Sequence, residues 1–338
     1  MNEILNKSQT TIEQKKIRLP LVEKYRPTLF NDILFDDFMK DKIKNILKSK
    51  QLPNMIISGE SSTGKTTTIL YMAKKIYKDD YENNVLELNA SYDRGLTMIQ
   101  QTILPFCKKK TVNYKLIILD EADSITQKAQ NLLNNIIAEY KKNTRFIFIC
   151  NDRCKINESI QSRCMIIYFP RISKKNIRKR LHYICEKESI EYDEDGINQL
   201  MFNSNYDIRQ CINNIECILH NKSKLTEEIV DKIIDVPKLY SIRNILKQCI
   251  AGDINAALQS IKYMYDTGFS ANDILLTFLK YLENYKDYKE FNDNNIDNKE
   301  LYKIISNSYI KVNNGIDSIL QLCGCISNIY IYLYKQNN

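Results

Sequence analysis

Met55-Ile-Ile-Ser-Gly-Glu-Ser-Ser-Thr-Gly-Lys-Thr66 determines the architecture that we expect for the first half of this chain. The stretch joins a short apolar run, the pattern G-x-x-x-x-G-K-[ST] and the first turn of a helical pattern, in that order. Glycines allow such a loop to wrap phosphate groups with backbone N–H groups, and the N-terminus of the following helix adds partial positive charge. The sequence therefore predicts a phosphate-binding loop between a strand and a helix.

The residues of this loop have separate expected roles toward a nucleotide. Lys65 should reach the β- and γ-phosphates, and the Thr66 hydroxyl should ligate Mg²⁺. The cofactors that the pattern predicts are therefore ATP and Mg²⁺. The candidate nucleotide-binding residues of the loop and the turn after it are Gly59, Glu60, Ser61, Ser62, Thr63, Gly64, Lys65, Thr66 and Thr67.

Two carboxylates follow a second apolar run, Leu116–Leu119. A strand that ends in acidic residues places them at the carboxyl edge of a parallel sheet, beside the phosphate-binding loop. Asp120 would hold Mg²⁺ through water, and Glu121 would orient and polarise the attacking water. Asn151 ends the next strand, where it could touch the γ-phosphate or this water. Arg163 is either a surface charge or an arginine finger that enters the site of a neighbouring subunit.

Short apolar runs alternate with helical patterns up to about Pro170, which predicts a doubly wound α/β domain. Most of the runs are continuous, as expected of strands buried on both faces of a parallel sheet. The five expected strands are Met55–Ser58, Val85–Asn89, Lys115–Asp120, Arg145–Cys150 and Met165–Phe169. Between them, Lys65–Lys78 has an apolar helical face, and Ser124-Ile-Thr-Gln127 is expected to be a capping box that opens another helix.

The rest of the chain, from Arg171 onward, has the periodicity of helices. The expected helices are Lys174–Lys187, Glu194–Asn203, Asp207–His220, Thr226–Asp235, Tyr240–Ile250, Ile254–Gly268, Asn272–Tyr285, Lys299–Tyr309 and Gly315–Tyr334. The charged, Asn-rich stretch Asp287–Asn298 is expected to be a surface loop. The chain is thus divided into a polar leader (1–18), an α/β domain (19–170), a small helical domain (171–236) and a helical bundle (237–338).

Composition argues against several classes of protein. Runs of about 18 or more uncharged apolar residues are absent, so no membrane span is expected. The polar residues 1–16 lack the apolar segment of a signal peptide, and we therefore expect an intracellular location. The ten cysteines contain no CxxC pair and only two histidines accompany them, which favours buried reduced thiols over zinc or disulfides. The net charge of +8 permits contact with nucleic acid without establishing it.

Several motifs together resemble those of replication factor C small subunits, the AAA+ clamp loaders of eukaryotes and archaea, which have relatives in large DNA viruses. The motifs are Val22-Glu-Lys-Tyr-Arg-Pro27, the phosphate-binding loop, Leu86-Glu-Leu-Asn-Ala-Ser91, Asp93-Arg-Gly95, Asp120-Glu-Ala-Asp123 and Gln161-Ser-Arg-Cys164. The similarity extends from about Leu19 to the C-terminus. It looks closest to the ATP-binding type called subunit 2 in animals, on the segments Cys249–Ile274 and Lys311–Gly324.

This resemblance implies an AAA+ P-loop NTPase domain with a parallel five-stranded sheet, a helical lid and a C-terminal helical collar. In the family, the segment that matches Val22–Pro27 lines the adenine and reaches the phosphates, so Tyr25, Arg26 and Pro27 are candidates for this role. The positions that match the remaining nucleotide-site motifs are Asn151 for sensor 1, Arg163 for the trans-acting finger and Arg209, in Asp207-Ile-Arg209, for the sensor-2 arginine that reaches the γ-phosphate.

The resemblance also implies partners. Family members form a five-subunit ring held by the collar, and the ring opens a sliding clamp and closes it around primer–template DNA. The implied partners are therefore other replication factor C subunits, a sliding clamp and primer–template DNA, for which Arg94 is a candidate contact. The implied location is the nucleus of a eukaryote or the replication compartment of a large DNA virus.

Some positions depart from the family's pattern. Glu60-Ser-Ser62 stands where the family usually has Pro-Pro-Gly, and Tyr206 replaces the glycine before the sensor-2 Asp. Tyr92 occupies a position that is usually small and acidic or polar. Neutral side chains at Gln100 and at Asn134-Asn135 replace arginines, the first of them on the DNA-facing helices. Because the ATP-site side chains are all retained, we expect hydrolysis to be retained and DNA contact by this subunit to be weakened.

Three alternative functions are consistent with the motifs of this sequence. The first is a clamp-loader ATPase subunit. The second is a structural ring subunit that binds ATP but hydrolyses it poorly, against which the presence of both Glu121 and Arg163 argues. The third is another AAA+ DNA-remodelling ATPase, of the Holliday-junction or initiator type, against which the segment Leu19–Pro27 and the helical collar argue. The sequence favours the first class.

Overall fold

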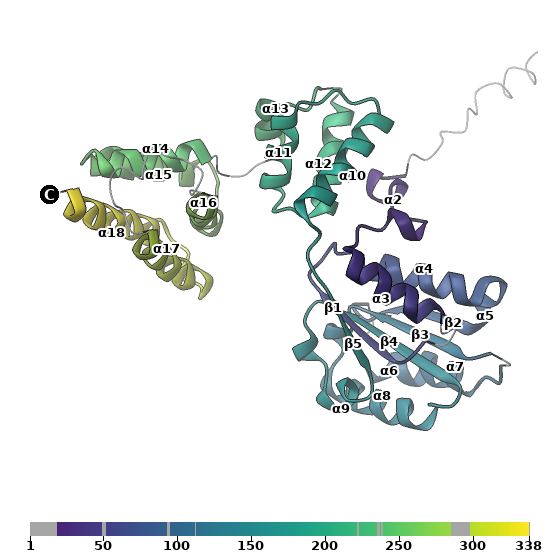
Figure 1. The fold of residues 1–338 in the computed structure, drawn as a ribbon. Coiled ribbons are helices and arrows are strands. Elements are labelled where there is room, and N and C mark those ends of the chain that lie inside the picture. Colours follow the sequence, from purple (N-terminus) through teal and green to yellow (C-terminus); the bar gives the residue numbers. More distant parts are fainter. Residues whose placement is uncertain are drawn as a thin grey trace, which may run out of the picture. The chain divides into compact units, whose positions relative to one another are not determined.

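In a computed structural model of the protein, residues 19–48, 52–92, 95–111, 113–221, 223–234, 237, 239–284 and 298–337 are described. The chain divides into two compact units, Met1–Glu227 and Glu228–Asn338. The first unit contains a sheet with helices on both faces and a further group of helices, and the second contains helices packed around a core of their own (Figure 1).

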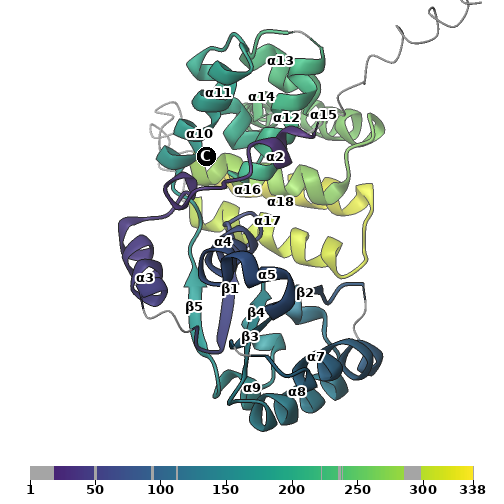
Figure 2. The same cartoon turned by 90° about the vertical axis from the view of Figure 1, so that its right-hand side faces the viewer.

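The sheet of the first unit has five parallel strands, in the order β2-β3-β4-β1-β5. The strands are β1 (Met55–Gly59), β2 (Val85–Asn89), β3 (Lys115–Asp120), β4 (Thr144–Cys150) and β5 (Met165–Phe169). They confirm the five predicted strands, with β1 and β4 each one residue longer than predicted. Because all strands run the same way, the loops after β1, β3 and β4 meet at one edge of the sheet (Figure 2).

Burial along the strands follows their place in the sheet. Every residue of β1 is buried, and β3 and β4 are buried over all but one residue each. The edge strands β2 and β5 are partly exposed instead, with Met165 and Tyr168 of β5 open to solvent. Continuous apolar runs therefore mark the central strands, which helices cover on both faces.

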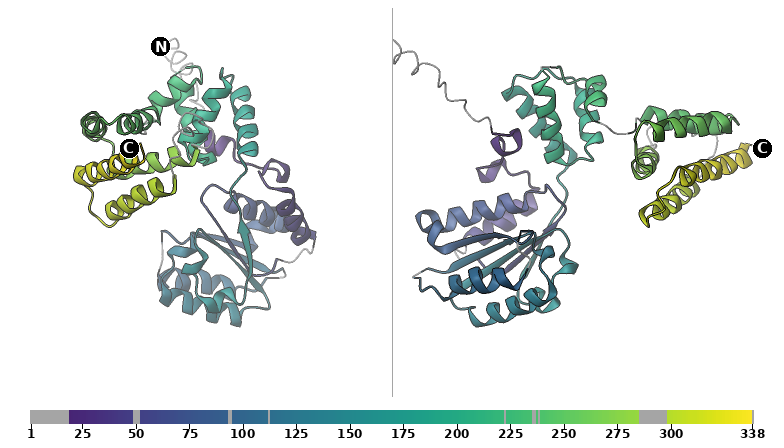
Figure 3. Two further views of the ribbon diagram at one scale, coloured as in Figure 1. Left: turned by 60° about the vertical axis from the view of Figure 1, so that its left-hand side comes forward. Right: turned by 180° about the vertical axis from the view of Figure 1, so that it is seen from behind.

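Two groups of helices cover the sheet (Figures 1 and 3). On one face, α3 (Asp37–Lys48), α4 (Lys65–Tyr77) and the short α5 (Tyr81–Asn84) enclose a core with β1. On the other face, a second core is enclosed by α6 (Leu96–Met98), the π-helical turn η3 (Ile99–Ile103), α7 (Leu104–Lys108), α8 (Gln127–Glu139) and α9 (Glu158–Gln161). Short 3-10 turns lie at Phe30–Asp32, Lys78–Asp80, Ala122–Ser124 and Arg153–Lys155.

The predicted capping box at Ser124 is wrong. Helix α8 begins at Gln127, and its N-cap is Thr126, whose side chain accepts a hydrogen bond from the Ala129 backbone N–H. Ser124 instead closes a 3-10 turn by donating its backbone N–H to the carbonyl oxygen of Glu121. The turn is needed to leave the end of β3, and it places the buried Ile125 between itself and the helix, so the cap falls two residues later.

Three helices, α10 (Lys174–Lys187), α11 (Glu194–Asn203) and α12 (Ile208–His220), follow β5, and we call them the lid helices. Helices α10 and α11 have the predicted bounds, and α12 starts one residue later than predicted because Asp207 is its N-cap. The short α2 (Leu21–Lys24) contacts α12 (Figure 2). Helix α13 spans Glu227–Ile233, and beyond Arg171 the described residues contain one isolated β-bridge, Tyr192 with Leu225.

The second unit contains the helices α14 (Leu239–Ile250), α15 (Ile254–Asp266), α16 (Ala271–Asn284), α17 (Asn298–Asn313) and α18 (Ile319–Asn337). Their apolar faces share one core. The last helix starts four residues later than predicted, since Gly315 has a φ of +96°, a left-handed conformation that ends α17. The predicted loop Asp287–Asn298 lies outside the described residues except for Asn298. Among the described helices, none has the length and apolar character to cross a membrane.

Candidate nucleotide-binding site

Lys65 lies at the centre of the predicted phosphate-binding loop. Its Nζ donates to the backbone oxygens of Gly59 at 2.7 Å and Glu60 at 2.6 Å, and to Oδ1 of Asn151 at 2.9 Å. Burial lowers the pKa of Lys65, while the charge of Asp120 opposes this shift. The loop thus holds an ammonium group in a fixed place between the ends of β1 and β4, where it could meet a phosphate.

A pair of oxygen ligands lies beside this lysine. The Thr66 hydroxyl donates to Oδ2 of Asp120 at 2.8 Å, which brings the first turn of α4 to the end of β3. Hard oxygen donors of this kind suit Mg²⁺, which usually takes one or two protein ligands and fills its other positions with phosphate and water. The described residues contain no cluster of three or more His, Cys, Asp or Glu side chains that could hold a metal by itself. The predicted Mg²⁺ ligands therefore fit a metal that arrives with a nucleotide.

The end of β3 has an unusual backbone. Glu121 has a φ of +52°, in the left-handed region that non-glycine residues seldom adopt, and its N–H donates to Oδ1 of Asp120 at 2.9 Å. Two residues on, Oδ2 of Asp123 accepts from the backbone N–H groups of Asn151 at 3.3 Å and Asp152 at 3.4 Å. These bonds fix the ends of β3 and β4 together, and they leave the Glu121 side chain exposed to solvent at the sheet edge.

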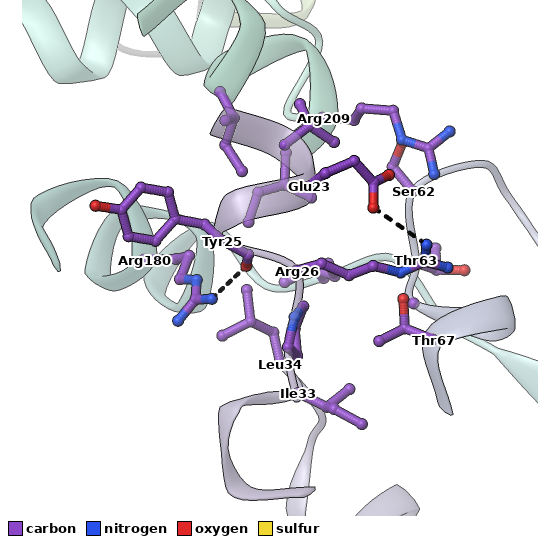
Figure 4. Close-up of a pocket in the computed structure, with 16 residues that line it drawn as sticks. Glu23, Tyr25, Arg26, Ile33, Leu34, Ser62, Thr63, Thr67, Arg180 and Arg209 are labelled. Carbon is purple, nitrogen blue, oxygen red and sulfur yellow. Dashed lines mark hydrogen bonds and ion pairs between the residues drawn. The ribbon is translucent and has the colours of Figure 1, made fainter. Parts of the chain in front are cut away.

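A pocket opens next to the loop, between α2, the start of α4 and the lid helices (Figure 4). Predicted residues that line it are Tyr25, Arg26, Pro27, Ser62, Thr63, Gly64, Thr67 and Arg209. Arg209 and Ser62 lie on one side of the pocket, and Tyr25 and Arg180 lie on the other. Its position beside the phosphate-binding loop suits the base and sugar of a nucleotide.

The segment around Tyr25 is attached to the lid helices. The Tyr25 hydroxyl donates to the carboxylate of Glu188, and Nζ of Lys24 pairs with the same carboxylate at 2.5 Å. Arg180 donates to the backbone oxygen of Tyr25 at 2.6 Å, and Oε2 of Glu216 accepts from the N–H of Leu21 at 3.2 Å. Burial, together with Glu188, raises the pKa of Tyr25. The pocket wall that Tyr25 forms is therefore connected to the lid helices.

One predicted residue lies apart from the contacts given above, and another lies outside the described residues. Arg163 is exposed, and its Nε donates to Oδ1 of Asn134 on α8 at 2.9 Å, so its guanidinium is held against its own α8 and does not line the pocket. The DNA candidate Arg94 lies outside the described residues. Its neighbour Tyr92 is 91% exposed, and Gln100 and Asn135 are exposed as well.

Comparison with known proteins finds matches over most of the chain. Its residues 55–171 match the family of ATPases associated with various cellular activities, 174–232 match the RFC1-like AAA+ ATPase lid domain, and 237–328 match the replication factor C C-terminal domain. Replication factor C subunit 2 of Arabidopsis thaliana is 35% identical over 92% of this chain and 93% of its own length. The chain belongs to the replication factor C small-subunit family.

Other relatives in this family bear different subunit names. Replication factor C subunit 4 of Schizosaccharomyces pombe is 35% identical and covers 92% of this chain and 91% of its own length. Human replication factor C subunit 5 is 38% identical over 80% of this chain and 81% of its own length. Among solved structures, the Thermotoga maritima RuvB Holliday junction branch migration motor superposes with a TM-score of 0.52, at 15% identity, over 73% of this chain and 92% of its own. This last similarity concerns the fold alone.

Sequence reasoning missed several contacts of this replication factor C subunit. Arg180 and Glu188 hold the Tyr25 segment from α10 and from its C-cap, and the helix at Lys174–Lys187 was predicted without any role in the site. Asp123 was noted only as part of a motif, and its hydrogen bonds to the end of β4 were not foreseen. The contacts join residues that are far apart in the chain, and no local pattern signals them. Asp207 was expected to belong to the sensor-2 motif, but its hydrogen bond to the loop at Ser62 was not.

Proposed function

We propose that this chain binds and hydrolyses ATP with Mg²⁺ as a small subunit of a replication factor C complex that loads a sliding clamp onto primer–template DNA. The observation that carries the proposal is the convergence at one sheet edge of Lys65, the Thr66–Asp120 pair and Asn151. A loop that only bound phosphate would not need the carboxylates of Asp120 and Glu121 at the end of β3. It would not need the Asn151 amide at the end of β4 either.

The roles proposed for these side chains follow from their chemistry. Lys65 binds the β- and γ-phosphates, and Asn151 holds Lys65 while its amide faces the γ-phosphate or the attacking water. Glu121 orients and polarises this water as a carboxylate. Arg209 reaches the γ-phosphate from the lid helices. Mg²⁺, when bound at Thr66 and Asp120, neutralises charge on the phosphates.

The remaining proposals concern the domains, the partners, the subunit type and the location of the protein. We propose an ATPase core over 19–170, a lid over 171–236 and a ring-forming collar over 237–338, with other replication factor C subunits, a sliding clamp and DNA as partners. The relatives bear the numbers 2, 4 and 5, and we propose the subunit 2 type of animals on the basis of the segments Cys249–Ile274 and Lys311–Gly324. The location proposed is intracellular, in a nucleus or a viral replication compartment.

The test is hydrolysis-dependent clamp loading by a reconstituted ring. The full-length chain is assembled with its partner subunits, and the retention of a labelled clamp on primed circular DNA is followed together with ATP turnover. In a ring whose other sites are inactivated, Glu121→Gln should leave ATP binding intact and lower turnover by about a hundredfold or more, because the base that polarises water is lost. Glu186→Gln, which changes an exposed carboxylate on α10, is the matched control and should leave turnover unchanged.

The alternative of a structural ring subunit gives a different result. If the Glu121→Gln ring turned over ATP and loaded the clamp as the unmodified ring does, the site of this chain would be catalytically idle. The proposal of hydrolysis by this subunit would then be wrong, and its role would be limited to ATP binding and ring structure.

A further inference from the structure

The side chain of Asp207 joins the lid helices to the phosphate-binding loop through its two oxygens. Oδ1 accepts hydrogen bonds from the backbone N–H groups of Arg209 at 2.8 Å and Gln210 at 3.3 Å, and so caps α12. Oδ2 accepts from the Ser62 hydroxyl at 2.9 Å and, more weakly, from the Ser61 hydroxyl at 3.4 Å. One carboxylate therefore contacts the loop and starts the helix that carries Arg209.

The backbone is in the left-handed region on both sides of this contact. Ser62 has a φ of +60°, and on the lid side Asn205 and Tyr206 have φ values of +52° and +59°. Such values are uncommon for side chains larger than glycine, above all for a ring as large as that of Tyr206, and the surrounding structure must hold them. The Lys174 ammonium lies 4.2 Å from the centre of the Tyr206 ring and helps to hold it.

A second contact joins the same loop to the start of the lid. The Glu60 carboxylate pairs with Arg171, which lies between β5 and α10. Both side chains are more than half exposed, so this ion pair by itself contributes little. Together with the hydroxyls of Ser61 and Ser62, however, it means that three consecutive loop residues contact the chain beyond β5 through their side chains.

We propose that Ser62 and Asp207 form a latch that holds the lid helices against the phosphate-binding loop and slows nucleotide release from this subunit. The inference rests on the proposed function, since it requires a nucleotide in the loop. The pocket is lined both by loop residues such as Thr63 and by lid residues such as Arg209 and Ile212, so a nucleotide in it would contact both of the parts that the latch joins. Parting them breaks the hydrogen bond of the latch.

Ser62 and Asp207 are thus positioning residues, which act through the loop backbone and through Arg209. Neither contributes the charge that binds phosphate, which Lys65 supplies. Loss of the latch should therefore raise the rate of nucleotide release and leave the rate of association almost unchanged. A change that merely destabilised the fold would have no reason to act on release alone.

The experiment is stopped-flow release of a fluorescent ADP analogue from the full-length chain, with unlabelled ADP in excess. Ser62→Ala and Ser62→Gly both remove the hydroxyl, and only Ser62→Gly also relieves the left-handed backbone. We expect both variants to speed release by about three- to tenfold, the change that corresponds to one hydrogen bond of ordinary net strength. Ser223→Ala removes a hydroxyl that donates to the Asn221 backbone oxygen after α12, outside the pocket lining. It is the matched control and should release the analogue as slowly as the unmodified chain.

A double-mutant cycle isolates the bond itself. In an Asp207→Ala background, where the acceptor is gone, Ser62→Ala should have no further effect on release. The latch is overturned if release stays slow in both Ser62 variants, if only one of them is fast, or if Ser62→Ala speeds release just as much without Asp207. An unmodified chain that bound no analogue at all would instead contradict the proposed function.

Discussion

At the scale of single residues, Lys65 is the group that we propose to hold the phosphates of a nucleotide. Its ammonium is buried between two backbone oxygens and the Asn151 amide, so its position is set before any phosphate enters. Such preorganisation favours phosphate binding, because an ammonium group that is already desolvated and oriented costs little further free energy when the phosphate binds. The lowered pKa of Lys65, caused by burial, is the cost of this placement, and a bound phosphate would oppose the shift by favouring the charged form.

Lys65→Ala should therefore weaken ATP binding by about tenfold or more, as expected for the loss of charge-assisted hydrogen bonds. Equilibrium binding of a labelled ATP analogue to the full-length chain measures this effect. Lys74→Ala, on the exposed side of the same helix, is the control and should bind as the unmodified chain does. Equal affinity for the unmodified chain and Lys65→Ala would show that the loop does not hold the phosphates.

At the scale of elements, the sequence predicted all five strands and most of the helices because each carries its own pattern. The apolar runs of β1, β3 and β4 are continuous because layers of helices bury these strands on both faces of the sheet. The edges of elements were less predictable, as at Ser124 and Gly315, because turns that connect elements have preferences of their own. The strand–loop–helix order at Met55–Thr66 could be predicted because the spacing of its glycines and lysine is a local pattern.

Contacts made across the fold had no such signal. Lys115 is an example, since it stands at the start of an apolar run and is fully buried. Its Nζ donates to the backbone oxygens of Phe106 at 2.9 Å, Cys107 at 2.7 Å and Lys109 at 2.5 Å, and so satisfies the end of α7. The burial of this charged side chain has an explanation only in the folded chain, where the carbonyl oxygens at the end of α7 lie beside the start of β3. The contacts of Ser62, Tyr25 and the lid helices are unpredictable for the same reason.

The helices α6 to α8 and the turn η3 between them cover one face of the sheet and carry the positions at which the family resemblance implied arginines. Gln100 and Asn135 are exposed there, whereas Asn134 accepts a hydrogen bond from Arg163. Gln100→Arg and Asn135→Arg should thus each add a phosphate contact without disturbing Arg163. We expect each to steepen the plot of log affinity for duplex DNA against log salt concentration by about 0.9.

The measurement is a salt titration of primed-DNA binding by the reconstituted ring. Asn213→Arg, which adds the same charge on an exposed position of α12, controls for a general increase in net charge. A slope that stays the same in Gln100→Arg and Asn135→Arg, or that rises equally in the control, would mean that this face does not meet DNA.

At the scale of the whole molecule, the proposed reaction involves other subunits. The nucleotide pocket is built from the core of the first unit, the segment around Tyr25 and the lid helices, and Arg163 is absent from its lining. Its guanidinium is exposed and is held by Asn134, and we propose that it acts on the site of a neighbouring subunit. A planar, permanently charged guanidinium can stabilise the charge that develops on a transferred phosphoryl group.

Turnover in mixed rings tests whether Arg163 acts on a neighbouring site. Rings are assembled from an Arg163→Ala chain and unmodified partners, and ATP binding by this chain is measured beside hydrolysis at the neighbouring site. Arg178→Ala, on the lid helix α10, is the control. We predict nearly unchanged binding and a loss of neighbouring turnover of about a thousandfold, the typical contribution of an arginine finger. An isolated chain that hydrolysed ATP at full rate, and lost this activity on Arg163→Ala, would contradict the account, because the arginine would then be acting on its own site.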